Sequence, residues 1–288
     1  MKSGPLVSVI CLCYNHERFV RESILSVLEQ SYPNVELIVV DDNSTDNSVN
    51  VIKETLKDHP EVKFIQHTKN QGNCKSFNEA WRMAGGEFFI DLAADDTLPK
   101  ERIAIGVKDF STRDNSYGVQ HGDVAYMTEA GIVYTHHSKE FAPKGGDIYI
   151  DLVERYFVSS ASLMIRKSVL DQLGGFDETL HYEDFDFLIR SSRLFKYFYT
   201  KEVLVNKRKV EGSMSDRQFQ RGSRQQLTTY RVCEKIFSLN KSPREDDALR
   251  SRLWYEIRQN LGRLDFALAA TYYKLLQKIS RVSRAAYK

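Results

Sequence analysis

Two pairs of acidic residues stand where an apolar run gives way to a polar loop. Asp41-Asp42 closes one such run and Asp95-Asp96 follows another. In an open α/β sheet, ligands bind beyond the carboxyl ends of the strands, so these pairs are candidate ligand contacts. Acidic clusters at one sheet edge repel each other unless a divalent cation or hydroxyl donors neutralise them. Oxygen ligands of this kind suit magnesium or manganese with a diphosphate, although a turn and a helix N-cap also explain the 41–46 cluster.

The elements that position these acids alternate between apolar runs and helical periodicity. This alternation is typical of a βαβ succession that builds a mainly parallel sheet flanked by helices. We expect strands at 6–12, 35–40, 62–65 and 88–92, with helices between them. From about residue 117 the runs become shorter, and we expect antiparallel strands at 118–127, 131–134 and 162–165. The fold class is therefore α/β, with a Rossmann-like sheet.

The chain is expected to form one domain over 1–215 and a helical appendage over 216–288, where polar helical sequence takes over. Its 41 basic and 39 acidic residues nearly cancel, which excludes a generally basic nucleic-acid binder. Four cysteines without a CxxC pair favour reduced thiols in a cytoplasmic protein. No apolar stretch reaches the length of a membrane span.

The motifs in this order resemble the inverting family-2 glycosyltransferases, which have the nucleotide-sugar-binding GT-A fold. The resemblance covers about residues 6–215. Its motifs are Val7 to Asn15, Ser26 to Asp46, Asn70-Gln71-Gly72 with Lys75 and Asn78, Gly86-Glu87-Phe88, Asp95-Asp96, Gly174 to Glu178 and Glu183-Asp184. The resemblance implies a nucleotide-binding half over about 1–98 and an acceptor half over about 99–215.

The resemblance also implies a donor site and a metal site. Asp41 or Asp42 would hold the base or ribose, and Asp95 would bridge through Mn²⁺ or Mg²⁺ to the diphosphate, with Asp96 as a supporting ligand. The donor-binding residues implied are Tyr14, Asn15, Glu17, Asp41, Asp42, Lys75, Ala94 and Asp95. Gly174-Gly175 would let the backbone turn close to the donor sugar.

Two positions depart from the family pattern around the metal. Ala93 stands where the first acid of the DxD motif is usual, and Val210 stands where many relatives have a histidine. Arg208 or Lys209 could supply positive charge to the leaving group instead, and Ser213 could donate a hydroxyl. Both losses raise the possibility of weak metal dependence.

Glu183-Asp184 matches the acidic motif at the start of a helix below the acceptor site, where the second residue acts as general base. A sugar hydroxyl is a poor nucleophile, and a positioned carboxylate takes its proton as it attacks the anomeric carbon. Attack opposite the leaving diphosphate inverts that centre. The alternative explanation is that these acids only offset a helix dipole.

The resemblance therefore implies transfer of a sugar from a nucleotide-diphospho-sugar, expected to be a UDP-sugar, to a glycan or lipid-linked acceptor. A non-catalytic nucleotide-sugar-binding or scaffold protein is the alternative that Ala93 and Val210 motivate. A nucleotidyltransferase needs a Gly-rich basic loop after the first strand, which 15–18 does not provide. The basic C-terminal helix, with Leu275, Leu276 and Ile279, suggests either a solvated face or peripheral membrane contact.

Overall fold

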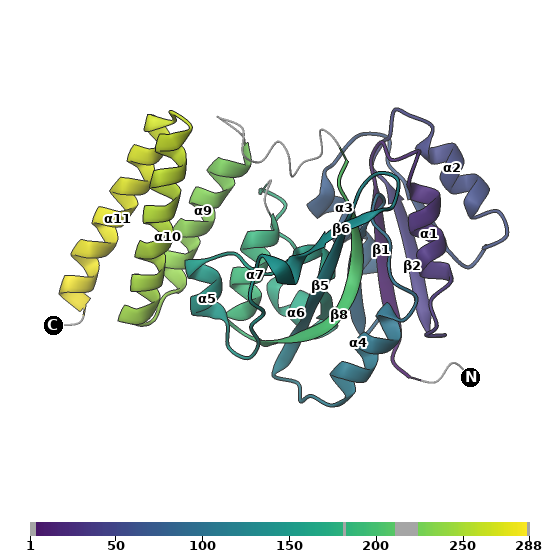
Figure 1. The fold of residues 1–288 in the computed structure, drawn as a ribbon, viewed down its shortest axis with the longest axis horizontal. Helices are drawn as coiled ribbons and strands as arrows, with labels where there is room; N and C mark the ends of the chain where they lie inside the picture. Colours follow the sequence, from purple (N-terminus) through teal and green to yellow (C-terminus); the bar gives the residue numbers. More distant parts are fainter. Residues whose placement is uncertain (1–3, 181–182, 211–223, 287–288) are drawn as a thin grey trace. The chain divides into compact units, whose positions relative to one another are not determined.

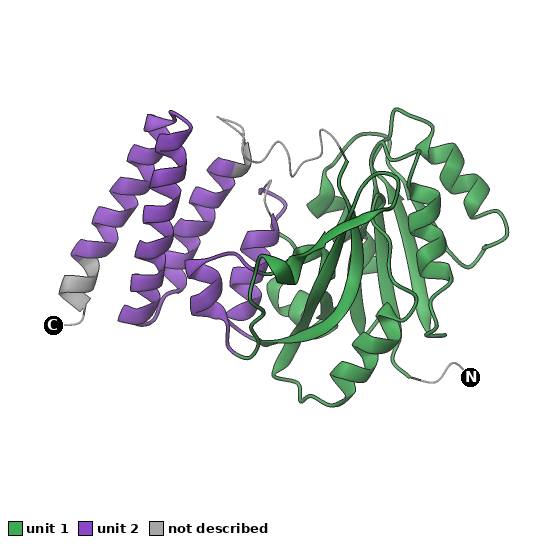
Figure 2. Ribbon diagram, in the orientation of Figure 1, with its two compact units in different colours: residues 1–146, 158–176, 195–210 green, residues 147–157, 177–194, 211–288 purple. Residues whose placement is uncertain are grey.

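The computed structural model describes residues 4–180, 183–210 and 224–286 (Figure 1). The chain divides into two compact units, shown in Figure 2. Unit 1 comprises residues 1–146, 158–176 and 195–210, and unit 2 comprises residues 147–157, 177–194 and 211–288. Each unit is described by itself.

The first half of unit 1 is a parallel sheet with helical crossovers. Its strands are β1 (Val7–Cys13), β2 (Val35–Asp41), β3 (Lys63–Gln66) and β4 (Phe88–Ala93), and its helices are α1 (Val20–Leu28), α2 (Ser48–Thr55) and α3 (Asn73–Met83). The four strands lie in the order β3-β2-β1-β4, and every neighbouring pair is parallel. The α/β fold class and the four expected strands are confirmed.

The second half of unit 1 extends the same sheet. It contains α4 (Arg102–Ser111), β5 (Tyr117–Met127), β6 (Val133–His136), η1 (His137–Lys139), η2 (Ser160–Ser162), β7 (Met164–Arg166), α6 (Lys167–Leu173) and β8 (Lys196–Arg208). The order continues from β4 through β7 and β5 to β6 in antiparallel pairs. β8 pairs with β5 in parallel, so the second half is not purely antiparallel as the sequence suggested.

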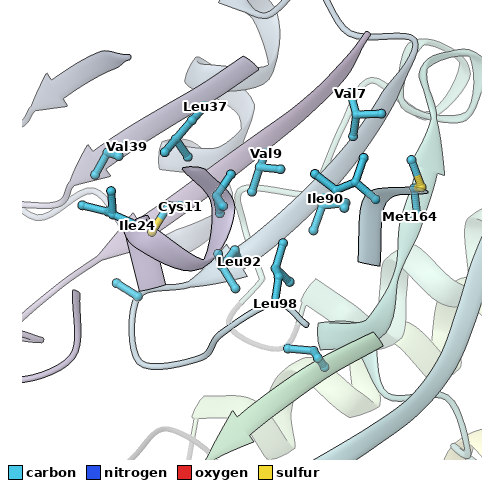
Figure 3. Packing of buried hydrophobic residues seen from close by; sticks show 14 of the residues in the cluster. Val7, Val9, Cys11, Ile24, Leu37, Val39, Ile90, Leu92, Leu98 and Met164 are labelled. Atoms are coloured by element: carbon cyan, nitrogen blue, oxygen red, sulfur yellow. The ribbon is translucent and has the colours of Figure 1, made fainter. Parts of the chain in front are cut away.

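The core of unit 1 explains why the first strands are continuous apolar runs. All seven residues of β1 are buried, because helices cover both faces of the sheet. Figure 3 shows Val9 and Cys11 of β1 packed beside Leu37 of β2, Ile24 of α1 and Ile90 of β4. All four cysteines are buried and form no disulfide.

Unit 2 is helical and includes segments from the middle of the chain. Its helices are α5 (Tyr149–Glu154), α7 (Glu183–Ser192), α9 (Arg224–Leu239), α10 (Pro243–Gly262) and α11 (Phe266–Ala286). α5 packs on α10 and α7 packs on α9, so 147–157 and 177–194 belong with the C-terminal helices. The sequence had placed both segments in the first domain because their helical signals are short. Within the described residues, no helix is long and apolar enough to cross a bilayer.

Candidate active site

Three loops of unit 1 meet at one edge of the sheet. β2, β1 and β4 are parallel neighbours, so their carboxyl ends point the same way. The loops that follow them are 14–19, 42–47 and 94–101. These loops carry most of the residues that the sequence predicted to bind the donor.

Asn15 and Glu17 fasten the first loop to the second. Asn15 has a φ of 59°, and its side-chain carbonyl accepts a 2.7 Å hydrogen bond from the amide of Thr45. The Glu17 carboxylate accepts a 2.7 Å hydrogen bond from the amide of Asn47. Tyr14 lies beside them with an exposed side chain. Asn15 and Glu17 thus hold the loops that follow β1 and β2 together.

Both oxygens of the Asp42 carboxylate have hydrogen-bond partners within the chain. Oδ1 lies 2.8 Å from Nδ1 of His67 and accepts a 2.8 Å bond from the amide of Gln71. Oδ2 accepts a 2.7 Å bond from the amide of Gly72, which precedes α3. Asp42 therefore ties the end of β2 to the loop between β3 and α3.

Asp41 differs from its neighbour because one of its oxygens lacks a partner. Oδ1 accepts a 2.9 Å bond from the amide of Ser44, whereas Oδ2 is buried with no hydrogen-bond partner among the described residues. A buried polar atom without a partner is costly and is a position where a ligand donor can bind. Of the two acids, Asp41 is the one with a carboxylate oxygen that has no partner among the described residues.

Asp95 and Asp96 occupy different environments at the end of β4. Asp95 is partly exposed, and its Oδ2 lies 4.0 Å from Nε2 of His16. Asp96 is buried and accepts a 2.8 Å bond from the amide of Arg208. Burial, reinforced by the charge of Asp95, raises the pKa of Asp96 to about 7. Ala94 between the strand and this pair is fully buried.

Strand β8 holds the turn that carries these acids. Thr97 exchanges two backbone hydrogen bonds with Asn206, of 3.1 and 2.9 Å. Arg208 donates from Nε to the carbonyl of Asp95 at 3.0 Å, and from its other nitrogens to the Glu129 carbonyl and the Glu22 carboxylate, both at 2.6 Å. The guanidinium is buried and committed to these partners. The sequence interpretation missed β8 and Asn206, because polar and apolar residues mix in this strand.

The residues at this edge could hold a divalent cation that is also bound by the phosphates of the substrate. Asp95 and His16 offer one carboxylate oxygen and one imidazole nitrogen. Among the described residues, no three His, Cys, Asp or Glu side chains gather in a metal-holding group. Magnesium sites commonly use one or two protein ligands with substrate phosphates and waters, and manganese shares the preference for oxygen ligands. The sequence interpretation had assigned His16 no role, since no HxxxH spacing marks it.

Position 175 requires a glycine because the backbone there lies close to α3. It has a φ of 84°, and a Cβ there would lie 2.3 Å from Oδ1 of Asn78. Asn78 exchanges two 2.9 Å hydrogen bonds with the backbone of Phe176, whose ring packs on Phe77. Lys75, on the same helix, is exposed.

The predicted catalytic acids lie in unit 2, at the start of α7. Glu183 and Asp184 are half-buried, and Asp186 in the same turn is buried. Asp186 binds Arg190 at 2.6 Å and Lys235 of α9 at 2.7 Å. The pair with Lys235 ties α7, which carries Asp184, to α9, whereas Arg190 lies on α7 itself. Ser213 lies outside the described residues, and Lys209 is exposed just after β8.

Lys235 also binds Asp177, at 2.5 Å. Burial opposes ionisation of Asp177, but hydrogen bonds from Lys235 and Thr179 outweigh it and lower the pKa of this carboxyl to about 2. The acid of the Gly-Gly-Phe-Asp-Glu motif is therefore a structural anchor within unit 2.

Four of its relatives match between 34% and 82% of this chain. The putative glycosyltransferase EpsE of Bacillus subtilis is 28% identical over 247 residues, which cover 82% of this chain and 84% of that protein. The matched segments span only 64%, 40% and 45% of three uncharacterized glycosyltransferases, one of Rickettsia typhi and two of Haemophilus influenzae.

Two solved structures share the fold. The S. aureus TarS 1–349 complex with UDP-GlcNAc has a TM-score of 0.69 at 19% identity, covering 89% of this chain and 73% of that one. The mannosyltransferase PcManGT of Pyrobaculum calidifontis, in complex with GDP-Man and Mn²⁺, has a TM-score of 0.61 at 18% identity, covering 99% and 87%. The model of glycosyl transferase family 2 matches residues 8–174, and the chain belongs to that family of glycosyltransferases.

Proposed function

We propose that this enzyme transfers a sugar from a UDP-sugar to a hydroxyl of a glycan or lipid-linked acceptor, with inversion. The observation that carries the proposal is the meeting of Asn15, Asp41 and Asp95 at one sheet edge, within the segment that the family model matches. Uridine is proposed because TarS, which shares the fold, is solved with UDP-GlcNAc, and guanosine is the alternative because PcManGT is solved with GDP-Man.

Asp41 is the proposed nucleotide acid. A base N–H or a ribose hydroxyl would satisfy its Oδ2, which has no partner among the described residues. The exposed ring of Tyr14 would edge the base, and Lys75 would lie near it. Asp42 instead keeps the 67–72 loop in place through its hydrogen bonds with His67, Gln71 and Gly72.

Asp95 and His16 would hold Mn²⁺ or Mg²⁺, with Asp96 as a supporting ligand. When bound, the cation stabilises the negative charge on the departing diphosphate. Lys209 is exposed and would add positive charge to the leaving group, as Ser213 would add a hydroxyl donor. Arg208 acts by holding the Asp95 carbonyl and the Asp96 carboxylate in position.

Asp184 is the proposed general base. It accepts the proton of the acceptor hydroxyl while that oxygen forms its bond to the anomeric carbon. The bond from that carbon to the diphosphate oxygen breaks on the opposite face, and the diphosphate leaves with the electron pair. Glu183 precedes it on the same helix turn, which Asp186 anchors through Lys235.

A calorimetric titration with UDP, GDP and ADP, each with and without Mn²⁺, tests the donor class. We expect UDP to bind in the presence of Mn²⁺, and GDP and ADP to bind at least about tenfold more weakly. Binding of none of the three would contradict the proposal. Binding of UDP without any turnover of UDP-sugars would instead favour the non-catalytic alternative.

We also propose that the reaction belongs to polysaccharide synthesis at the cell envelope, on its cytoplasmic side. The four buried cysteines without a disulfide are typical of a reducing compartment. Cell fractionation tests this location, and recovery of the protein outside the cytoplasm and its membrane fraction would contradict it.

A further inference from the structure

An exposed strip of large apolar side chains runs along the α10–α11 hairpin in unit 2. Its members are Trp254 and Leu261 of α10, and Phe266 and Tyr273 of α11. Their exposed fractions are 48, 44, 62 and 46%. Within each helix the two residues are seven positions apart, which places them on the same face. We call these four residues the aromatic strip.

The two helices contribute to one continuous surface. α10 and α11 pack side by side (Figure 1), and the rings of Trp254 and Tyr273 meet edge-on with centroids 6.4 Å apart. Leu261 and Phe266 flank the short connection between the helices, where Leu264 is also exposed. Exposed apolar side chains that gather in this way mark an interaction surface more often than scattered ones do.

The face that the sequence had suggested for membrane contact is a different one. Leu275, Leu276 and Ile279 are buried in unit 2, as is Tyr272. These residues form the inner side of α11 and are not available to a partner. The outward-facing side of the hairpin is the aromatic strip.

Exposed cations lie beside the aromatic strip, and the exposed acid Asp247, seven positions before Trp254, is paired with Arg250. Arg258 is exposed one turn after Trp254, and Lys274 is exposed beside Tyr273. The sequence 257–288 contains one acid, Asp265, against Arg258, Arg263, Lys274, Lys278, Arg281, Arg284 and Lys288. Asp265 is occupied as a cap, since it accepts a 3.1 Å hydrogen bond from the amide of Leu268.

We propose that the aromatic strip docks the enzyme on an anionic lipid bilayer. Trp and Tyr side chains favour the membrane–water interface, and flanking cations are attracted to anionic headgroups. A second copy of the chain fits this surface less well. A two-fold contact through the strip would bring Arg258 and Lys274 close to the same cations of the other copy. This docking does not depend on which sugar is transferred.

Co-sedimentation with vesicles tests the proposal. The full chain is mixed with vesicles of phosphatidylcholine alone or of phosphatidylcholine with phosphatidylglycerol, at low and high salt. We expect at least about fivefold more protein on the anionic vesicles at low salt, and loss of that excess at high salt. The double variant Trp254→Ala/Phe266→Ala should lose the binding. Met83→Ala, a similarly exposed apolar residue of unit 1, should retain it.

Thermal melts and UDP titrations of each variant separate docking from folding and from donor binding. Equal binding of wild type and the double variant to anionic vesicles would overturn the proposal. The proposal would also be overturned if light scattering showed a dimer for wild type and a monomer for the double variant, because a second copy would then cover the aromatic strip. A charge-reversal variant, Arg258→Glu/Lys274→Glu, should fold normally and lose the salt-sensitive part of the binding.

Discussion

The Nδ1 atom of His67, just after β3, lies 2.8 Å from Oδ1 of Asp42, just after β2, and both side chains are buried. This contact distinguishes two adjacent acids that sequence reasoning could not separate. Both carboxylate oxygens of Asp42 have hydrogen-bond partners within the protein, whereas Oδ2 of Asp41 has no partner among the described residues. We therefore assign the structural role to Asp42 and the nucleotide role to Asp41.

Substitution of Asp42 should mainly reduce stability, whereas substitution of Asp41 should mainly reduce UDP affinity. Asp42→Ala should lower the free energy of unfolding by about 3 kcal/mol, because it leaves the donors of Gln71 and Gly72 without their acceptor. Asp41→Asn should change the free energy of unfolding by less than about 1 kcal/mol, because the amide oxygen still accepts the hydrogen bond from Ser44. The same substitution should weaken UDP binding about tenfold. Urea unfolding and calorimetry measure the two effects. A stable Asp42→Ala that fails to bind UDP would reverse the assignment.

Arg208 should act mainly on stability and on the Asp95–Thr97 turn. Arg208→Lys removes the planar fork that reaches Glu22, the Glu129 carbonyl and the Asp95 carbonyl. We expect a loss of about 3 kcal/mol in the free energy of unfolding, because the buried ammonium of the lysine cannot make all the hydrogen bonds that the guanidinium makes. Lys209→Ala is the matched control, and it should unfold like wild type because Lys209 is exposed. Equal stability of Arg208→Lys and wild type would refute the structural role.

Acid should destabilise the protein through His121. Burial, which outweighs the hydrogen bond to the Lys144 carbonyl, lowers the pKa of His121 to about 4 from the ordinary histidine value of 6.5. Between those values the unfolded state binds a proton that the folded state does not, so stability falls as pH decreases from about 6.5 to 4. The loss is at most about 3 kcal/mol. His121→Gln should flatten this part of the stability profile measured by urea unfolding. An unchanged slope would show that other groups cause the acid sensitivity.

The metal site should depend on His16 as well as on Asp95. Their side-chain atoms lie 4.0 Å apart, and Ala93 leaves the site without its usual first acid. His16→Ala and Asp95→Asn should each weaken the binding of Mn²⁺ to the complex of the protein with UDP about tenfold, because each substitution removes one metal ligand. Electron paramagnetic resonance of free Mn²⁺ measures this directly. His59→Ala, a histidine paired with Glu61 outside the site, is the control. Wild-type affinity in His16→Ala would exclude it as a ligand.

The parallel half of the sheet could be predicted from sequence because its strands are buried on both faces. Burial of all seven β1 residues produces the continuous apolar run, and helical stripes mark the crossovers. β8 could not be predicted in this way. Its 13 residues alternate irregularly between buried and exposed, and register shifts interrupt its pairing with β5. The parallel pairing of β8 with β5 depends on contacts between residues that lie far apart in the sequence.

The candidate site was predictable at the level of segments but not of individual side chains. The positions of Asn15, Asp41 and Asp95 follow from the parallel order of three strands. The roles of Asp42 and Arg208 depend on hydrogen bonds to residues 25 to 186 positions away, which no local pattern encodes. His16 carries no spacing signal, and only the fold brings it near Asp95.

Turnover of UDP-sugars by wild type and Asp184→Asn tests the central claim most directly. The assay measures release of UDP, with a panel of acceptors and with water alone, and calorimetry measures UDP binding on the same samples. Loss of the general base should lower turnover at least about 100-fold while UDP affinity stays within about twofold. Asp58→Asn, an exposed carboxylate, should behave as wild type. Turnover by Asp184→Asn within about threefold of wild type would contradict the assignment of Asp184 as the base.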